Sequence, residues 1–250
     1  VRDIASGLMS ELSSLSQSAG NDWRSEVSRL GETAIEDVVS ALNTRFAGSS
    51  LFAGTAERNS ALASSSDILS AIRSEVAGAA SVADVQGRID DWFEAPAGGF
   101  VTIAYTGDNG PLSERRIDDL TTVNLNARAD DPAIRSVLKG LALAAIADDT
   151  SLALTDAQRD EVVALSTAEL FRSSTHLSEL QGRLGNSQAR AEDALTRLRA
   201  EEGGLDLLRS ELLTADPFEA ATRLEQLQAQ LETHYTVTAR LSQLSLSRYL

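Results

Sequence analysis

The residues best suited to bind a metal ion are aspartates in the middle of the chain. They are Asp108-Asn109-Gly110, Asp118, Asp119, Asp130 and Asp131. A cluster of carboxylate and amide oxygens can bind calcium, but this spacing does not follow the twelve-residue loop of the EF-hand. An Asx-Gly pair is also ordinary turn chemistry. A calcium site and a plain turn are both open, and the spacing favours the turn.

The side chains best suited to acid–base catalysis are the two histidines, His176 and His234. They lie on different predicted helices, each within an apolar stripe, and two histidines cannot form a zinc site without carboxylate ligands. The sequence contains no Glu-x-x-His pair, no Gly-x-Ser-x-Gly motif and no phosphate-binding glycine loop followed by lysine. Lys139, the only lysine, lies inside a predicted helix. We expect no catalytic residues, no bound metal and no cofactor.

The composition excludes several further classes of function. The chain has no cysteine, which rules out disulfides, thiolate zinc sites and cysteine nucleophiles. Its formal net charge of −15 repels phosphate backbones and anionic lipid, so we expect no nucleic-acid or membrane partner. No apolar run approaches the ~20 residues that span a bilayer. Aromatic residues make up only 4% of the chain, which favours long helices over sheets.

Two amphipathic helices are predicted before residue 50, because apolar residues recur every three or four positions. The first stripe is Ile4, Leu8, Leu12 and Leu15, and the second is Trp23, Val27, Leu30, Ala34, Val38, Leu42 and Phe46. Gly20-Asn21-Asp22 separates them, and Asn21 or Asp22 can cap the second helix. Gly48-Ser49-Ser50 ends it.

Residues 51–150 show a looser pattern. The apolar segment from Leu51 to Thr55 is predicted to be an extended turn or small hairpin. Two short amphipathic helices follow, one around residues 68–76 and one around residues 85–93. Pro96-Ala97-Gly98-Gly99 then interrupts the chain.

Strands are predicted only after this break. Phe100 to Tyr105 is rich in β-branched and aromatic residues and is predicted to be a strand, and residues 115–117 and 121–125 are further strand candidates. Asp131-Pro132 then starts a helix, with the acid as its cap and proline at the first helical position.

The last hundred residues are predicted to be helical. Thr155 and Gln158 form a capping box, and Asp216-Pro217 starts a final helix. The two apolar stripes are Val162, Leu165, Leu170, Leu177, Leu180, Leu184, Ala191, Leu195 and Leu198, and then Leu224, Leu227, Leu231, His234, Thr238, Leu241 and Leu244. Alternating steps of three and four residues are typical of coiled coils, and such narrow stripes need a partner helix.

These elements predict a mainly α protein, an elongated antiparallel helical rod with an inserted small α+β domain. The two ends cannot each bury a narrow stripe alone, so they should pair antiparallel and direct the middle outward. The expected parts are N-terminal rod helices at 1–57, an inserted α+β outer domain at 58–150, a C-terminal rod helix region at 151–215 and a last helix at 216–250.

The first residues carry a further expectation. The chain opens at Val1 with Arg2-Asp3-Ile4 already in helical pattern, so we expect a natural segment to precede it. In the family that the short motifs described next resemble, such a segment forms an apolar helix beside the C-terminal one, and this resemblance implies that without it the helix at 216–250 would lack an intramolecular partner. We then expect it to fray, or to pack against the rod or another molecule.

Several short motifs resemble the flagellin family. Asn43-Thr44-Arg45-Phe46-Ala47-Gly48 and Leu51-Phe52-Ala53-Gly54-Thr55 are similar to the turn after its second helix. Their form resembles hook–filament junction proteins more than filament flagellins, which usually lack the Phe-Ala-Gly. Tyr105 to Pro111 with Arg116-Ile117 is similar to the junction proteins' outer domain, and Leu244 to Leu250 to their apolar C-terminus.

The resemblance implies a non-enzymatic structural subunit of the bacterial flagellum, a hook-associated protein joining hook to filament. It also implies export through the flagellar secretion apparatus and an extracellular location. The implied partners are further copies, another hook-associated protein, flagellin, and an export chaperone on the C-terminal helix, which would be of the axial-core type. Two alternatives stay open, a filament flagellin with a reduced outer domain and a helical scaffold unrelated to flagella.

Two sets of residues are expected to carry this function. The assembly and chaperone surface comprises Leu224, Leu227, Leu231, Leu241, Leu244, Leu246, Tyr249 and Leu250, and the family turn motif comprises Asn43, Arg45, Phe46, Leu51, Phe52 and Gly54. A terminal apolar strip without a partner is an exposed patch, and such patches mark interaction sites. The alternative is that the strip folds back on the rod as part of its core.

Overall fold

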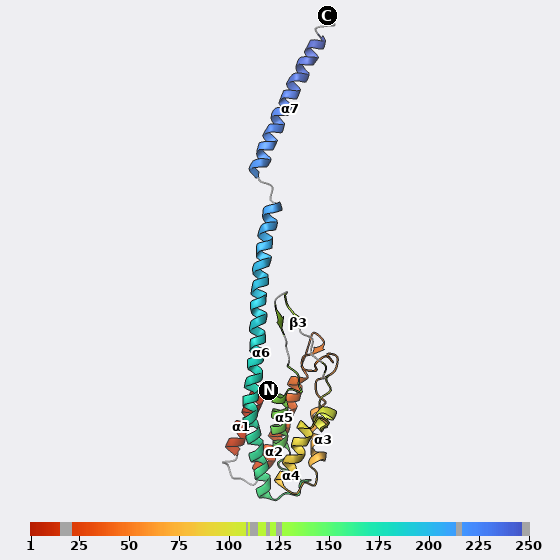
Figure 1. The fold of residues 1–250 in the computed structure, drawn as a ribbon, viewed down its shortest axis with the longest axis vertical. Coiled ribbons are helices and arrows are strands. Elements are labelled where there is room, and N and C mark those ends of the chain that lie inside the picture. The colour runs from red at the N-terminus through yellow and green to blue at the C-terminus, as the bar shows by residue number, and fades with distance from the viewer. Residues whose placement is uncertain are drawn as a thin grey trace. The chain divides into compact units, whose positions relative to one another are not determined.

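The computed structural model describes residues 1–15, 22–108, 110, 115–118, 121–123, 127–213 and 217–246. Most of them are helical, which confirms the predicted mainly α class (Figure 1). The chain divides into two compact units, Val1–Glu192 (unit 1) and Asp193–Leu250 (unit 2). The elements are α1 (Arg2–Leu15), α2 (Trp23–Leu42), β1 (Arg45–Phe46), β2 (Ser49–Ser50), α3 (Ser65–Val76), α4 (Val82–Glu94), the π-helix η1 (Phe100–Ala104), β3 (Arg115–Arg116), β4 (Thr122–Val123), α5 (Pro132–Ala145), α6 (Asp156–Leu213) and α7 (Pro217–Leu246).

The centre of unit 1 is the contact between α2 and α5. Helix α5 is buried along nearly its whole length, as expected for a helix whose apolar residues surround it on all sides. A Cβ on Gly31 of α2 would lie 2.6 Å from the backbone nitrogen of Ala145. Only glycine therefore allows the two backbones to approach this closely.

Helix α6 covers another side of α5. The Ser166 hydroxyl donates a hydrogen bond of 2.7 Å to the Gly140 carbonyl, and a Cβ on Gly140 would lie 2.8 Å from Leu170 Cγ. Helix α5 is thus enclosed between α2 and the first part of α6, and residues 58–150 share their core with the helices at both ends of unit 1.

The helices near the two ends of unit 1 pair antiparallel, as predicted. Arg2 Nη1 of α1 donates to Gln181 Oε1 of α6 at 2.7 Å. Arg24, at the start of α2, reaches Asp160 Oδ1 at 2.8 Å. Arg2 at the start of α1 thus lies beside a later part of α6, and Figure 1 shows α1 and α6 side by side and running in opposite directions.

The predicted strand at Phe100 to Tyr105 is wrong, because Phe100–Ala104 forms η1. Phe100 is 1% exposed, and its ring lies 6.3 Å from Trp92 and 5.9 Å from Phe93, centroid to centroid. Phe100 and Ala104 are buried whereas Thr102 between them is exposed, which fits helical spacing and not the alternation of a strand, so packing against α4 overrides local β-propensity. Only Tyr105 keeps a strand-like contact, an isolated bridge to Leu62.

The other strands and the helix ends agree better with expectation. β3 pairs antiparallel with β4 inside the two segments predicted as strands. Helix α2 ends at Leu42 rather than near Phe46, because the chain there forms the hairpin β1–β2. Asp22 occupies the N-cap position of α2, but its side chain makes no capping hydrogen bond, and Asn21 lies outside the described residues.

Unit 2 contains the last part of α6 and helix α7. Helix α7 is continuous from Pro217 to Leu246, so the fraying expected for this segment is not observed over that range.

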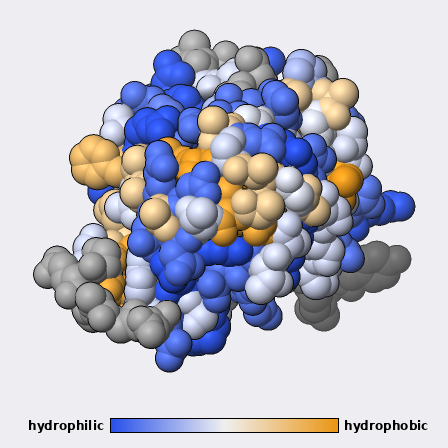
Figure 2. Space-filling view, turned by 90° about the horizontal axis from the view of Figure 1, so that it is seen from below, coloured by the Kyte–Doolittle hydropathy of each residue, from blue (hydrophilic) through white to orange (hydrophobic). Residues whose placement is uncertain are grey.

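Within the described part of the chain, no helix is long and apolar enough to span a membrane. A space-filling view along the axis of Figure 1, seen from its lower end, shows hydrophilic residues surrounding a smaller apolar area (Figure 2).

Candidate functional site

The leucines predicted as an assembly surface on α7 are exposed within unit 2. Leu224, Leu227 and Leu231 have 58%, 55% and 54% of their surface exposed, and Leu241 has 61%. Their steps of three and four residues place the first three on one face of the helix. We call these four residues the α7 seam. Leu244 and Leu246 belong to α7, their side chains are not described, and Tyr249 and Leu250 lie outside the described residues.

A second row of exposed leucines lies on the last part of α6, and the sequence analysis identified only its first two members. Leu195 and Leu198, which belonged to the predicted stripe, are 45% and 37% exposed. The stripe continues beyond them through Leu205, Leu208 and Leu212, which are 60%, 56% and 86% exposed. Their spacing of three, four or seven residues was the signal that could have identified them.

Exposed leucines in heptad spacing have a definite physical consequence. A helix packs such a row into the spaces between side chains of a partner helix. Leaving it in water forfeits about 25 cal/mol for each Å² of apolar surface. The α7 seam and the end of α6 are therefore surfaces that association would stabilise, although their chemistry provides no catalytic group.

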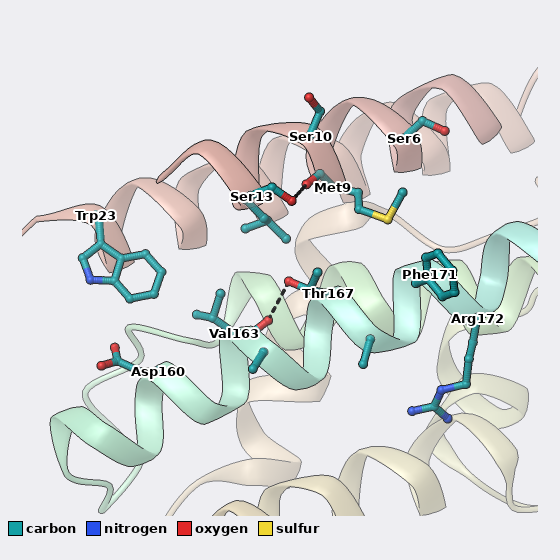
Figure 3. A pocket seen from close by; sticks show the side chains of 13 residues that line it. Ser6, Met9, Ser10, Ser13, Trp23, Asp160, Val163, Thr167, Phe171 and Arg172 are labelled. Atoms are coloured by element: carbon teal, nitrogen blue, oxygen red, sulfur yellow. Dashed lines mark hydrogen bonds between the residues drawn. The ribbon is translucent and has the colours of Figure 1, made fainter. Parts of the chain in front are cut away.

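Unit 1 has its own apolar surface feature, a groove between α1 and α6 with a volume of about 880 Å³. Figure 3 shows side chains from the two helices facing each other across it. Its apolar lining comes from Met9, Leu12, Trp23, Val163, Ala164, Ala168 and Phe171, and its polar lining from Ser6, Ser10, Ser13, Asp160, Thr167 and Arg172. We call it the α1/α6 groove.

Two details make this groove less polar than its sequence suggests. The Ser13 hydroxyl donates to the Met9 carbonyl at 2.9 Å, and the Thr167 hydroxyl donates to the Val163 carbonyl at 3.0 Å (Figure 3). Both hydroxyls are thus satisfied by their own helices. Phe171, at the edge, is 67% exposed, an unusual amount for a phenylalanine beside an open groove.

The family turn motif begins with the hairpin β1–β2. The Asn43 side chain fixes its start by donating to the Leu62 carbonyl at 3.0 Å and accepting from the Leu62 amide at 2.9 Å. Ala47 and Gly48 at the tip have φ angles of 51° and 85°, as the tight turn of a two-residue hairpin loop requires. The Arg45 guanidinium donates to the Arg58 carbonyl. The hairpin is therefore well defined by its local contacts.

The second half of the motif packs against the other segment that resembled the same family. Gly54 has a φ of +66°, and a Cβ there would lie 2.4 Å from the Asp108 carbonyl oxygen. The Thr55 hydroxyl donates to Asp108 Oδ2 at 2.6 Å, and the Asp108 amide donates to the Ala53 carbonyl at 3.0 Å. Phe52 packs partly buried against the core. Residues 51–55 and 105–108 thus form two turns that are hydrogen-bonded to each other.

Tyr105 joins this pair of turns to the core. It is 7% exposed, and its hydroxyl donates to the Asp108 carbonyl at 3.1 Å. Burial raises the pKa of the Tyr105 hydroxyl to about 12, and the nearby carboxylate of Asp130 adds to the effect. A hydroxyl so protected from ionisation is a structural group here.

The aspartates considered for calcium binding have other partners. Asp108 Oδ1 accepts from the Gly110 amide at 2.9 Å, Asp130 forms a two-point ion pair with Arg128, and Asp131 caps α5. Asp118 lies beside β3, and Asp119 is outside the described residues. Within the described ranges, no group of three or more His, Asp or Glu side chains could hold a metal ion.

The remaining chemical candidates lie on different helices. His176 is exposed and lies at the edge of a cleft beside α5 and α6, and His234 is exposed on α7. Lys139 is 7% exposed and contacts Asp90 and Glu94. Its burial opposes the charged form, but the hydrogen bonds that its ammonium donates to these two carboxylates raise the pKa of Lys139 overall. Lys139 is thus a paired cation inside unit 1.

The comparisons with known proteins bear on the C-terminal part. Residues 172–250 match a family model described as the bacterial flagellin C-terminal helical region. The match covers most of α6 and all of α7, including the α7 seam, and supports the flagellin family for this chain. Neither the search of curated proteins nor that of solved structures found a match.

Proposed function

We propose that this chain is a structural subunit of the bacterial flagellum that assembles with further copies and other axial proteins through its exposed leucine rows. The observation that carries the proposal is the coincidence of the flagellin match at residues 172–250 with the α7 seam. A heptad row of leucines that is more than half exposed on a single chain would be buried in a polymer, because helices of neighbouring subunits can pack against it.

The finer proposal is a position at the hook–filament junction, outside the cell. It is supported by the turn motif from Asn43 to Thr55 and by the similarity of residues 105–111 to the junction proteins' outer domain. The alternative within the same family is a filament flagellin with a reduced outer domain, and outside it a helical scaffold. The division into rod parts at 1–57 and 151–215, an outer domain at 58–150 and an axial helix at 216–250 belongs to this proposal.

The partners follow from the same surface. The α7 seam and the residues from Leu244 to Leu250 would be held by an export chaperone before secretion and by other axial subunits afterwards. Both occupants would recognise one apolar helix face, so their binding should be mutually exclusive. No catalytic step is part of this function.

Electron microscopy of gold-labelled protein on intact flagella tests the location. A junction subunit should place label at one point between hook and filament, whereas a filament flagellin should place it along the filament. A non-flagellar scaffold should leave the flagellum unlabelled, which would remove the proposal. Deleting the gene should release filaments from their hooks, and filaments still attached would exclude the junction role.

Substitutions on α7 test the assembly surface. Leu227→Ser with Leu231→Ser should abolish incorporation into flagella, because both remove seam side chains without disturbing unit 1. Phe218→Ser is the matched control, since Phe218 lies on the same helix at 80% exposure but outside the heptad steps. If both variants incorporate like the original chain, the α7 seam is not the assembly surface.

A further inference from the structure

We propose that the α7 seam binds the α7 seam of a neighbouring copy only while His234 is uncharged, so that mild acid weakens the assembly. The proposal rests on the proposed function, because it requires that other subunits cover α7 in the flagellum. It names the partner of the seam and the side chain that regulates the contact.

His234 occupies a step of the leucine repeat on α7. It follows Leu231 by three residues and precedes Leu241 by seven, and it is exposed in the single chain. These steps place His234 on the same face of the helix as the leucines of the α7 seam. A partner helix that covers the whole seam must therefore cover His234 as well.

The nearest neighbours of His234 on the helix surface are uncharged. Residues three and four positions away lie beside a helical residue, and for His234 they are Gln230, Leu231, Val237 and Thr238. The Thr238 hydroxyl donates to the His234 carbonyl at 2.7 Å, so its proton is already used by the backbone. None of these neighbours can neutralise a positively charged imidazole ring.

The ionic residues of this stretch lie on the other side of the helix. They are Glu225, Glu232 and Arg240, and the helical repeat places each of them at least about 120° around the helix from His234. Tyr235, at the flank of the seam, is a neutral phenol. The face of α7 that would meet a partner is thus uncharged as long as His234 is neutral.

This uncharged face favours α7 of another copy as the partner. The net charge of −15 makes copies of the chain repel one another. Eight of the 21 residues from Asp193 to Leu213 on α6 are Asp, Glu, Lys or Arg, but only three of the 23 from Leu224 to Leu246 on α7. Two α7 seams can therefore meet without like charges facing each other. The titratable groups that the second helix brings to this face are its own His234 and Tyr235.

The chemistry of the imidazole ring sets the direction of the pH effect. Histidine gains or loses its charge between about pH 5 and pH 8. Neutral imidazole has one N–H group to satisfy, whereas imidazolium has two and a full charge. Burying an unpaired charge is much more costly than burying a neutral polar group. Covering the seam therefore favours neutral His234, and protonation in acid favours separation of the two helices.

Release from isolated flagella tests this effect, and the second histidine provides the control. His176 is exposed on α6 and lies at a cleft whose lining includes Glu94 and Glu169, so its protonation leaves the seam unchanged. Flagella carrying the full-length chain are held at about pH 7.5 or about pH 5.5 and then pelleted. The chain released into the supernatant is quantified by mass spectrometry for the original sequence, His234→Gln, His234→Leu and His176→Gln.

We expect the original chain and His176→Gln to be released at least about tenfold more at the lower pH. His234→Gln and His234→Leu should be released equally at both values, because neither replacement takes up a proton. Leucine also completes the seam, so this variant remains informative if glutamine weakens the assembly. Circular dichroism should show the same helix content at both pH values for every chain.

Cross-linking tests the partner, because the chain has no cysteine of its own. Gln230→Cys lies beside the seam, and Glu232→Cys is the matched control on the far side of the same helix. In flagella treated with a short bis-maleimide, position 230 should link to position 230 of another copy at least about tenfold more than 232 links to 232. Links from position 230 only to a different axial protein would overturn the pairing of two α7 seams.

The outcomes separate this inference from the proposed function. A chain that is absent from flagella removes the proposed function. A chain that is present in flagella but is released equally at both pH values overturns the role of His234 alone. The same is true if both His234 variants keep the acid-dependent release, because other groups would then cause it.

Discussion

The two units use the same residue type in opposite ways. In unit 1, Leu141 of α5 has no exposed surface, whereas Leu227 of α7 in unit 2 is 55% exposed. Helix α6 repeats the contrast along one element, since Leu170 is 1% exposed and Leu208, further along, is 56% exposed. An apolar stripe therefore indicates that a helix needs a partner helix. Whether the same chain provides that partner depends on which elements fold beside the stripe.

This contrast separates stability from assembly. Unit 1 contains the buried core that resists unfolding, and the leucines of unit 2 add little to the stability of a single chain. Substitutions that reduce stability should therefore fall in unit 1, and those that reduce association should fall on exposed surfaces. The following predictions test this division.

The largest effect is expected from Leu141→Ala. Truncating a fully buried leucine costs about 2–5 kcal/mol, from lost burial and the cavity that remains. Leu227→Ala is the matched control on α7, where exposed substitutions usually stay within about 0.5 kcal/mol. Chemical denaturation followed by circular dichroism measures both. Equal losses for the two variants would show that α7 contributes to the core.

Two glycine substitutions give the next largest difference. Gly31→Ala places a methyl group 2.6 Å from the Ala145 nitrogen, and overpacking of this kind costs about 1–3 kcal/mol. Gly204→Ala on the unit 2 part of α6 meets nothing within 4 Å and should stabilise the helix by up to about 1 kcal/mol. The midpoint of thermal unfolding should therefore fall for Gly31→Ala and rise for Gly204→Ala. A destabilising Gly204→Ala would mean that this stretch already packs closely against another element.

A smaller effect is expected from alkaline pH, and it should be confined to unit 1. The pKa of Tyr105 is raised to about 12 in the fold, whereas an unfolded tyrosine ionises near pH 10. The stabilisation is complete below about pH 10 and is lost as the pH rises towards 12, because the unfolded chain releases the proton first. Tyr105→Phe should be less stable at neutral pH by about 1 kcal/mol, the worth of its hydrogen bond, and should lose less stability between pH 10 and 12. A spectroscopic titration giving Tyr105 an ordinary pKa would refute this.

The sequence predicted local structure well where the signal was local. The acid and proline at Asp131-Pro132 start α5, and Thr155 with Gln158 form the reciprocal hydrogen bonds of a capping box. Phe100 to Tyr105 was misassigned because its conformation depends on Trp92 and Phe93 in α4, a contact that no pattern of neighbouring residues reveals.

The candidate surfaces were predictable only in part. The spacing of Leu224, Leu227 and Leu231 identified the α7 seam, but its exposure depends on which helices are near. The α1/α6 groove could not be predicted, because its lining joins α1 to a segment about 160 residues later, from Asp160 to Arg172. Phe46 was identified as part of a motif, but its outward direction follows from the hairpin register.

The smallest effect is expected from ending the chain after Leu213, which removes α7 completely. If unit 1 is self-sufficient, the free energy of unfolding of its core should change by no more than about 0.5 kcal/mol. Incorporation into flagella should nevertheless be lost, because the α7 seam is absent. Hydrogen exchange at the amides of α5 measures this free energy most directly, because the slowest amides exchange only when the whole core unfolds. Faster exchange in α5 after truncation would show that α7 stabilises unit 1, and the separation between a stable core and an associating helix would then fail.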